Sequence, residues 1–357
     1  MDHVYLSSKY DAEIYHLPYW NSSVIYNETI YPLQNKDGSV SDIPLMYHAE
    51  EIFSVRSYDL ETLFTQGEDY VLKDGKISIL PNGNIPTAKY SEYYFDEEKP
   101  GKCRPLKDGG FALYSEGGEF YRYQLCVSYK HSDTWKGPIP KKKGHLLPLF
   151  CEKLLKKEPI KAVMFGDSIT WGANSSGKSD TKPFVPRWAD MFPSEIERNY
   201  HCPVEVINTA VGGKTSTWGK DVIYESVVSH HPDLAVIGFG MNDGSNQIAP
   251  EVFDQNIRSM IDAIRKESPN STIILLNCIL QNKELVRYCD GFQEKYTAVF
   301  EEIEKDYKEV AFTNIMELHK HLLTLKKYAD MTGNNINHIN DFTARLYSQA
   351  LFATIQK

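Results

Sequence analysis

Long hydrophobic runs, paired cysteines and positive charge are all scarce in this sequence. No apolar run approaches the roughly 20 residues that a transmembrane helix needs, so we expect no membrane span or membrane partner. The first twenty residues also lack a basic segment followed by a continuous apolar segment, and so do not resemble a signal peptide. We therefore expect a cytoplasmic protein, or a secreted one whose signal peptide has been removed.

Charge and cysteine spacing exclude further classes. The formal net charge is -9 and no basic stripe is present beyond a short lysine run at 141–143, so we expect no nucleic-acid partner. The six cysteines show no CxxC spacing, which favours reduced, buried, structural thiols over a disulfide framework. The sequence has no HExxH motif and no Cys/His cluster with ligand spacing, so we expect no metal site.

The 357 residues divide into two regions of different pattern. Residues 1–140 contain short strand-like runs separated by turn signals such as Asp37-Gly38 and Asp74-Gly75, which predict an all-β domain of the β-sandwich or jelly-roll-like type. Within it, 69–80 predicts a hairpin, and the alternation over 120–130 predicts a half-buried strand. Residues 141–158 are interpreted as a linker with a short amphipathic helix.

Strands and helices alternate in the remaining region, 159–357. Apolar runs predict strands at 160–165, 204–209, 233–239, 272–279 and 310–314, and helical periodicity predicts helices at 250–267, 293–307 and 341–355. This alternation predicts an α/β domain with a parallel sheet covered by helices on both faces.

The first three predicted strands each end in a small polar cluster. Asp167 and Ser168 follow the first strand, Gly213 follows the second and Asn242 follows the third, while His338 precedes the last helix. Because the carboxyl ends of parallel strands lie at one edge of a sheet, where ligands bind in open α/β folds, we expect these residues to converge.

Such a set matches the requirements of acyl transfer. Ser168 would be the nucleophile, and His338 would take its proton and pass it to the leaving alcohol. The backbone N–H groups of Ser168 and Gly213 and the side-chain amide of Asn242 would hold the oxyanion. Each residue also has an ordinary interpretation as a turn, cap or loop residue, but their joint order favours a hydrolase.

Four blocks, taken in order, resemble the pattern of the SGNH (GDSL-like) hydrolase superfamily over about residues 158–357. The blocks are Gly-Asp-Ser-Ile at 166–169, Gly213, Gly-x-Asn-Asp at 240–243 and His338 before a terminal helix. The resemblance implies a flavodoxin-like three-layer α/β/α fold, a serine esterase with the roles given above and no metal or organic cofactor, and Asp167 as support for the nucleophile loop. Members with an N-terminal β-sandwich resemble carbohydrate esterases, which implies an acetylated oligosaccharide or small-molecule ester as the substrate.

The sequence departs from this family at position 335. The family has an Asp three residues before the His, and here that residue is Asn335, which can orient an imidazole but carries no negative charge. Two hypotheses follow: a Ser–His dyad in which a carbonyl orients His338, or a triad completed by another acid. At the usual Asp position, Asn335 is the candidate catalytic residue. Asp330 and Asp341 are the nearby acids.

Competing functions also have sequence support. Residues 172–179 match the phosphate-loop pattern G-x-x-x-x-G-K-[ST], but they do not directly follow a strand, and Pro183 and Pro186 disfavour a helix after them. We interpret this segment as a flexible polar loop beside the active site, with Trp171 and Trp218 as sugar-stacking or packing residues. A lipase- or thioesterase-type acyl hydrolase and a catalytically inactive glycan-binding protein are also compatible with the sequence.

Overall fold

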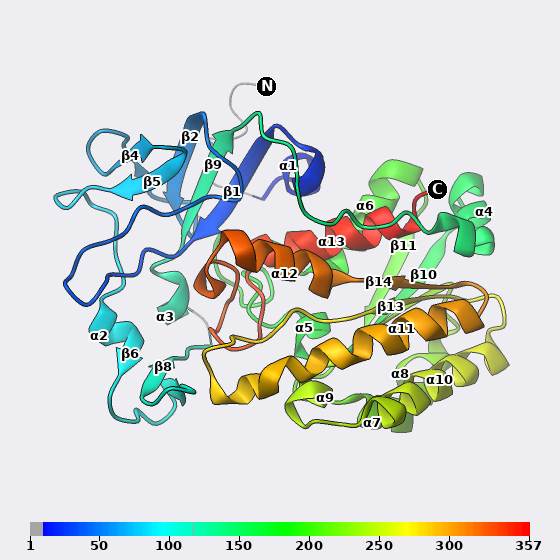
Figure 1. Ribbon diagram of the computed structural model, residues 1–357. Helices are drawn as coiled ribbons and strands as arrows, with labels where there is room; N and C mark the ends of the chain where they lie inside the picture. Colours follow the sequence, from blue (N-terminus) through cyan, green and yellow to red (C-terminus); the bar gives the residue numbers. More distant parts are fainter. Residues whose placement is uncertain (1–9, 117) are drawn as a thin grey trace.

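The computed structural model describes residues 10–116 and 118–357 of the chain. An antiparallel β region, coloured blue to cyan in Figure 1, lies beside an α/β region coloured green to red. The division predicted from the change of sequence pattern is therefore present. The predicted boundaries at 140 and 158 stay a prediction.

A five-stranded parallel sheet forms the centre of the α/β region. Its order is β11-β10-β12-β13-β14. The strands are β10 (Ile160–Gly166), β11 (Val204–Asn208), β12 (Leu234–Gly238), β13 (Thr272–Leu276) and β14 (Val310–Thr313). All five predicted strands are present, and the first lies between the second and third, which is the flavodoxin-like order. This order reverses between β10 and β12, where such folds bind ligands.

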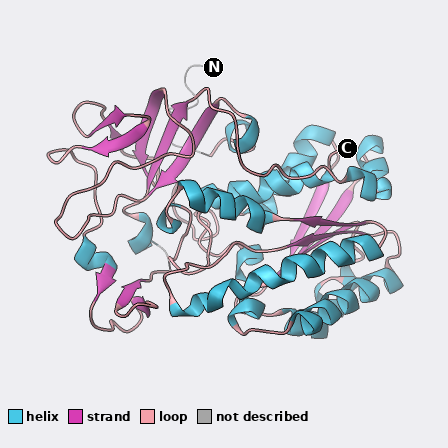
Figure 2. Ribbon diagram, viewed as in Figure 1, coloured by secondary structure: helices cyan, strands magenta, loops and turns pink. Residues whose placement is uncertain are grey.

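Helices cover both faces of the parallel sheet (Figure 2). One face packs against α4 (Pro148–Lys156), α6 (Trp188–Tyr200), α12 (Ile315–Leu325) and α13 (Asp341–Ile355), and the other packs against α8 (Ile223–Ser226), α10 (Pro250–Glu267) and α11 (Lys295–Asp306). Successive residues of β10, such as Met164 and Phe165, belong to different core clusters, because their side chains point to opposite faces of the sheet. Since both faces are buried, these strands are continuous apolar runs. The three-layer prediction is confirmed.

Within residues 10–116 and 118–140, the β region contains three small antiparallel sheets. The largest has the order β1-β9-β2-β3, formed by β1 (Val24–Ile30), β9 (Leu125–Lys130), β2 (Glu51–Ser57) and β3 (Leu63–Phe64). The predicted hairpin at 69–80 is β4 (Tyr70–Lys73) and β5 (Lys76–Ile79). A third sheet has the order β6-β8-β7, with β6 (Tyr94–Phe95), β8 (Phe111–Leu113) and β7 (Cys103–Pro105). The short helices here are α1 (Ala12–Tyr15), α2 (Tyr90–Tyr93) and α3 (Gly118–Tyr121).

The prediction of one half-buried strand over 120–130 was wrong in two respects. Phe120 and Tyr121 belong to α3, and the strand β9 begins only at Leu125. Five of its six residues are buried, so it is not half-exposed. The reason is its position, because β9 lies between β1 and β2 and the chain just before it, at Gln124, donates hydrogen bonds to the carbonyls of Ala329 and Thr332.

Helix α13 joins the two regions. Every residue of α13 is buried, including Arg345 and Gln349. Arg345 Nη1 lies 2.6 Å from the carbonyl oxygen of Tyr26, and Gln349 Nε2 lies 2.8 Å from that of Leu17. One hydrophobic cluster contains residues of the β region, of α13 and of the parallel sheet. The N-terminal region therefore packs directly on the last helix. The predicted base, His338, lies in the loop just before this helix.

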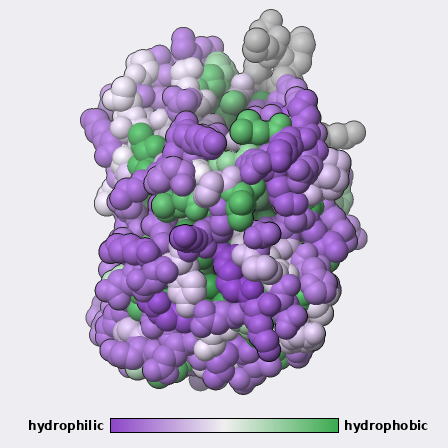
Figure 3. Space-filling view, turned by 90° about the vertical axis from the view of Figure 1, so that its right-hand side faces the viewer, coloured by the Kyte–Doolittle hydropathy of each residue, from purple (hydrophilic) through white to green (hydrophobic). Residues whose placement is uncertain are grey.

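The molecule has a largely hydrophilic face (Figure 3), and its six cysteines are free thiols. Figure 3, which views the right-hand side of Figure 1, shows a largely hydrophilic face with hydrophobic side chains gathered in its upper half. Helix α4 exposes Leu155, at 71%. Among the helices of residues 10–116 and 118–357, none is both long and apolar enough to cross a bilayer. The six cysteines are free thiols, and all but Cys289 are buried.

Candidate active site

The nucleophile candidate lies where β10 ends. A Cβ at Gly166 would collide with the carbonyl oxygen of Gly238 on β12, so only glycine permits the two strands to approach so closely. The carboxylate of Asp167 accepts a hydrogen bond from Ile169 N at 2.9 Å and caps the short helix α5 (Ser168–Trp171). Ser168 is thus the first residue of a capped helix at the sheet edge, with 6% of its surface exposed.

The structure brings Ser168 and His338 together. His338 Nε2 lies 2.9 Å from Ser168 Oγ, a hydrogen-bond distance, although the residues are 170 positions apart. The loop before α13 is held by Asn334, whose Oδ1 accepts hydrogen bonds from the backbone N–H groups of residues 336, 337 and 338. Local bonding therefore fixes the backbone from which the imidazole extends.

The other imidazole nitrogen faces two residues that the sequence did not predict. His338 Nδ1 lies 2.6 Å from Asn174 Oδ1 and 3.2 Å from Glu116 Oε2. Both oxygens are acceptors, so Nδ1 is the protonated nitrogen and Nε2 is the nitrogen that accepts the hydrogen bond of Ser168. Glu116 follows β8 in the N-terminal region, and Asn174 follows α5.

Glu116 carries a stable negative charge beside the imidazole. Burial alone would raise its pKa, but hydrogen bonding to His338, the charge of His338 and hydrogen bonds from Tyr114 and Asn334 lower the pKa of Glu116 to about 2. The distances from Glu116 Oε1 are 2.8 Å to Tyr114 Oη and 3.1 Å to Asn334 Nδ2. Its side chain is 46% exposed, so solvent weakens this charge's effect.

The prediction that Asn335 orients the imidazole is corrected. Asn335 Oδ1 accepts hydrogen bonds from Tyr93 Oη at 2.9 Å and Asn282 Nδ2 at 3.1 Å, and its Nδ2 donates to the carbonyl of Leu113 at 2.8 Å. Within the described chain it makes no hydrogen bond to His338. Asn335 has a φ of 65°, a conformation that Asn tolerates better than most residues, and its amide joins the loop to its neighbours.

Neither nearby acid takes that place. The carboxylate of Asp330 accepts hydrogen bonds from the backbone N–H groups of Tyr31 and Lys327, at 2.7 and 2.9 Å. The carboxylate of Asp341 accepts one from Ser176 N at 2.9 Å. Both groups are buried and organise the backbone around the loop.

The two remaining oxyanion candidates lie at the same sheet edge. A Cβ at Gly212 would be 3.8 Å from the Cβ of Ser168, so the loop after β11 passes beside the nucleophile. Gly213 follows with a φ of 76°, which favours glycine. Asn242, on the short helix α9 (Met241–Ser245), donates from Nδ2 to the carbonyl of Lys214 at 3.0 Å. The loop and the amide are therefore fixed to each other.

Asp243 connects the loop that follows β11 with the start of α9 through hydrogen bonds. It accepts hydrogen bonds through Oδ1 from Ser216 N at 2.9 Å and through Oδ2 from Gly240 N at 3.2 Å. Ser216 begins α7 (Ser216–Asp221), so the buried carboxyl joins the starts of two helices. Its position next to Asn242 fixes the helix that presents the amide.

Asp167 leads to a prediction about stability. Burial raises its pKa to about 7; the bond from Ile169 N opposes the shift and the charge of Asp243 adds to it. Because the folded value exceeds the unfolded one, stability falls as the pH rises from about 4 to about 7. Asp167→Asn keeps an acceptor for Ile169 N without ionising. In thermal unfolding, we expect the Tm of this variant to fall less than the Tm of the wild type when the pH is raised from about 4 to about 7. If the Tm of the wild type and of Asp167→Asn changed equally over this pH range, the raised pKa of Asp167 would be contradicted.

The segment 172–179 is not a phosphate loop. It follows α5 rather than a strand, and no helix begins at Lys178, since α6 starts only at Trp188. The expectation of a flexible polar loop is wrong for residues 173–176, which are buried. There the N–H of Ser176 donates to Asp341 and its hydroxyl accepts from Val185 N, whereas residues 177–179 are exposed. The segment packs beside the site and supplies Asn174.

The two missed residues had no direct sequence signal. Glu116 stands 222 residues before His338, next to glycines that indicate only a turn. Asn174 lies inside the phosphate-loop pattern, which pointed to different chemistry. The one signal was indirect. Because position 335 holds Asn, any acid that contacts His338 has to come from another part of the chain.

Comparison with known proteins adds independent findings. The curated "Arylesterase" of Vibrio mimicus is 26% identical over 156 residues, which are 44% of this chain and 73% of that protein. "Esterase TesA" of Pseudomonas aeruginosa is 33% identical over 94 residues, 26% of this chain and 46% of that protein. The chain thus spans about half the length of the second relative.

The comparison with solved structures gives matches at low identity and with TM-scores below 0.5. A two-domain esterase active on acetylated mannans has a TM-score of 0.48 and 18% identity, covering 60% of this chain and 54% of that one. A mutant of Axe2, an acetylxylan esterase from Geobacillus stearothermophilus, has a TM-score of 0.46 and 17% identity, covering 55% of this chain and 94% of that one. The profile of the GDSL-like Lipase/Acylhydrolase family matches residues 164–343. That match spans half of the chain and contains both Ser168 and His338, so the chain belongs to the GDSL-like lipase/acylhydrolase family and is a carboxylic ester hydrolase.

Proposed function

We propose that this protein is a serine esterase that removes O-acetyl groups from a carbohydrate through an acyl-Ser168 intermediate. The single observation that carries the proposal is the chain of contacts Ser168 Oγ–His338 Nε2, at 2.9 Å, with His338 Nδ1 facing Asn174 and Glu116. A nucleophile, a base and groups that orient the base are the minimum that acyl transfer needs.

The proposed reaction has two halves. As Ser168 Oγ attacks the ester carbonyl, His338 Nε2 takes its proton, and it then gives that proton to the leaving alcohol oxygen. Water repeats the sequence on the acyl-enzyme and releases acetate. The backbone N–H groups of Ser168 and Gly213, with the Asn242 hydrogen not donated to Lys214, would hold the oxyanion.

A carbohydrate substrate is supported by the surroundings of the nucleophile. Trp171, three residues after Ser168, is 42% exposed, and Lys178 Nζ lies 4.4 Å from its ring centroid. The ammonium group lies over one face of this exposed indole, so the opposite face would be the one that stacks on a sugar ring, with the ammonium as a nearby charged group. Trp218 is half-buried and packs against Phe165, at 5.7 Å between ring centroids, so its role is packing.

The proposed role of Glu116 leads to a prediction. Its carboxylate would stabilise the imidazolium that forms during attack, by about 1–2 kcal/mol for a half-exposed charge in direct contact. We therefore expect Glu116→Gln to lower kcat about tenfold or somewhat more with little change in KM.

The matched control is Glu152→Gln, an exposed acid on α4 paired with Lys156. It should leave kcat and KM unchanged. If Glu116→Gln were as active as the wild type while Asn174→Ala lost activity, the amide alone would orient His338, and a triad completed by Glu116 would be excluded.

The best support for the inactive glycan-binding hypothesis is Asn335, which stands where the family has an Asp. The contact between Glu116 and His338 removes that support, since a carboxylate lies at the imidazole after all. Acetate release from a panel of acetylated oligosaccharides, with Ser168→Ala as control, tests the proposal. We expect release that depends on Ser168. Hydrolysis of long-chain acyl esters or thioesters without any acetate release would favour a lipase or thioesterase instead.

A further inference from the structure

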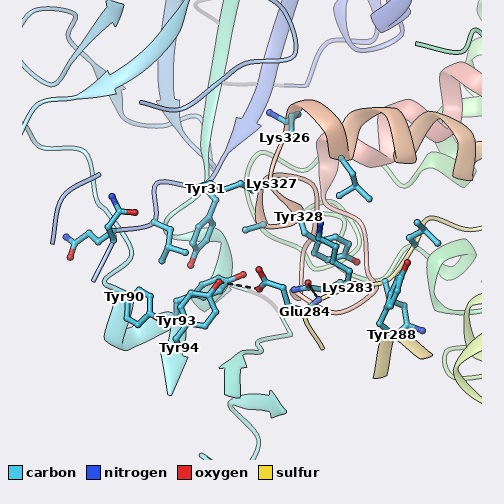
Figure 4. Close-up of a pocket in the computed structure, with 18 of the residues that line it drawn as sticks. Tyr31, Tyr90, Tyr93, Tyr94, Lys283, Glu284, Tyr288, Lys326, Lys327 and Tyr328 are labelled. Carbon is cyan, nitrogen blue, oxygen red and sulfur yellow. Dashed lines mark hydrogen bonds between the residues drawn. The ribbon is translucent and has the colours of Figure 1, made fainter. Parts of the chain in front are cut away.

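A cavity separate from the residues of the candidate active site lies where the N-terminal region meets the α/β region (Figure 4). Its volume is about 640 Å³, within the roughly 300–1,000 Å³ of small-molecule sites. It is lined by chain segments 31–36, 90–94, 280–288 and 323–329, and neither Ser168 nor His338 is among its lining residues. The reaction proposed above does not use this cavity.

One wall of the cavity is a continuous row of tyrosines. Ring centroids are 5.8 Å apart for Tyr31 and Tyr93, 4.7 Å for Tyr93 and Tyr94, and 4.9 Å for Tyr94 and Tyr90. Figure 4 shows Tyr288 away from this row, among the residues of the opposite side. A tyrosine offers an apolar face and a polar tip, which matches the C–H faces and hydroxyl edges of sugar rings.

Two buried polar atoms in the lining have no hydrogen-bond partner in the described part of the chain. They are Tyr31 Oη and Gln281 Oε1, on residues that are each 1% exposed. Leaving such atoms without a partner is unfavourable, so they point to a ligand that satisfies them. Burial raises the pKa of Tyr31, so its phenol stays a donor, while the amide oxygen accepts. Ligand hydroxyls can serve both atoms, since a hydroxyl accepts and donates.

The lining is also positively charged, in a chain whose net charge is -9. Lys36, Lys283 and Lys327 line the cavity, and none forms an ion pair within residues 10–116 and 118–357. Among the described lining residues Glu284 is the one acid, and it accepts a hydrogen bond from Tyr94 Oη at 3.2 Å. This local excess of ammonium groups favours an anionic ligand.

We propose that this cavity binds a segment of an acidic oligosaccharide, whose rings stack on the tyrosines and whose carboxylates meet the lysines. An acyl chain would leave the amides and ammonium groups without partners, and a neutral sugar would leave the lysines unpaired. The bound segment would rest against the catalytic loop, because Tyr93 and Asn282 donate hydrogen bonds to Asn335, three residues before His338. This site extends beyond the proposed deacetylation and does not require Ser168.

The test is calorimetric titration of the full-length Ser168→Ala protein, in which turnover is removed. The probes are a xylo-oligosaccharide carrying one glucuronic acid and the same oligosaccharide without it, and a galacturonic acid trimer and its methyl ester. In each pair we expect the acidic member to bind at least about tenfold more tightly. Lys283→Gln/Lys327→Gln should abolish this preference. Lys266→Gln/Lys308→Gln, a matched pair of exposed lysines outside the lining, should retain it.

A second variant separates binding from folding. Tyr31→Phe removes only the unpartnered hydroxyl, so its Tm should stay equal or rise, while both members of each pair bind about 2- to 10-fold more weakly. Equal affinity within each pair, no binding at millimolar sugar, or an unchanged preference in the lysine double variant would overturn the proposal. Tighter binding of ATP or inorganic phosphate than of the acidic sugars would overturn it too. A negative result here leaves acetate release by the wild type unaffected, so the two proposals fail separately.

Discussion

Ser168→Ala is expected to lower kcat for ester hydrolysis by a factor of about 10⁵–10⁶. The hydroxyl lies at hydrogen-bond distance from His338 Nε2, at 2.9 Å. Without it no acyl-enzyme can form, and the remaining rate would reflect only the oxyanion donors and substrate binding. The measurement is initial-rate kinetics with an activated acetyl ester.

The controls for this prediction test the dependence of the two residues on each other. His338→Ala should lose nearly as much activity, and the double variant should lose no more than the worse single variant, because residues that act as a unit are not additive. Ser259→Ala, an exposed serine on α10, should be fully active. A Ser168→Ala protein that kept more than about a hundredth of wild-type kcat would contradict the assignment.

Asn242→Ala should lower kcat about 10²–10³-fold, a smaller loss than for Ser168→Ala or His338→Ala, which corresponds to about 2.7–4 kcal/mol of transition-state stabilisation. The amide is 7% exposed and fixed by its bond to the carbonyl of Lys214, so it is preorganised for charge that develops only during attack. KM should therefore change little, since the lost interaction is made only in the transition state.

Asn246→Ala serves as the control, because it changes an exposed asparagine at the end of the same helix α9. It should retain wild-type kinetics. If Asn242→Ala instead raised KM and left kcat unchanged, Asn242 would bind the ground state rather than the oxyanion.

The parallel sheet was predictable because burial on both faces makes its strands apolar throughout. All five strands and the helices α10 and α13 lie where runs and periodicity placed them. Ser168 and His338 could also be brought together from the sequence, because parallel strands end at one edge and the loop before α13 returns to that edge. Strand β9 was less predictable, since its burial depends on its neighbours rather than on its own pattern.

The partners of the imidazole depend on tertiary packing. Glu116 reaches His338 because the β region packs on α13 through contacts such as that of Arg345 with Tyr26. Asn174 reaches it because the chain after α5 is packed and held by Asp341 through Ser176. No spacing along the chain encodes either contact, so the departure at Asn335 could show that the usual acid was missing but not which residue replaced it.

Covalent catalysis by Ser168 can be tested by finding where the acyl group is held. The wild type would be mixed with an activated acetyl ester, quenched during the first turnover, digested and mapped by mass spectrometry. We expect one acetyl group per chain, on Ser168, and none at that position in His338→Ala under the same conditions. Turnover with Ser168 unmodified, or an acetyl group held on another residue of the active enzyme, would show that Ser168 is not the nucleophile.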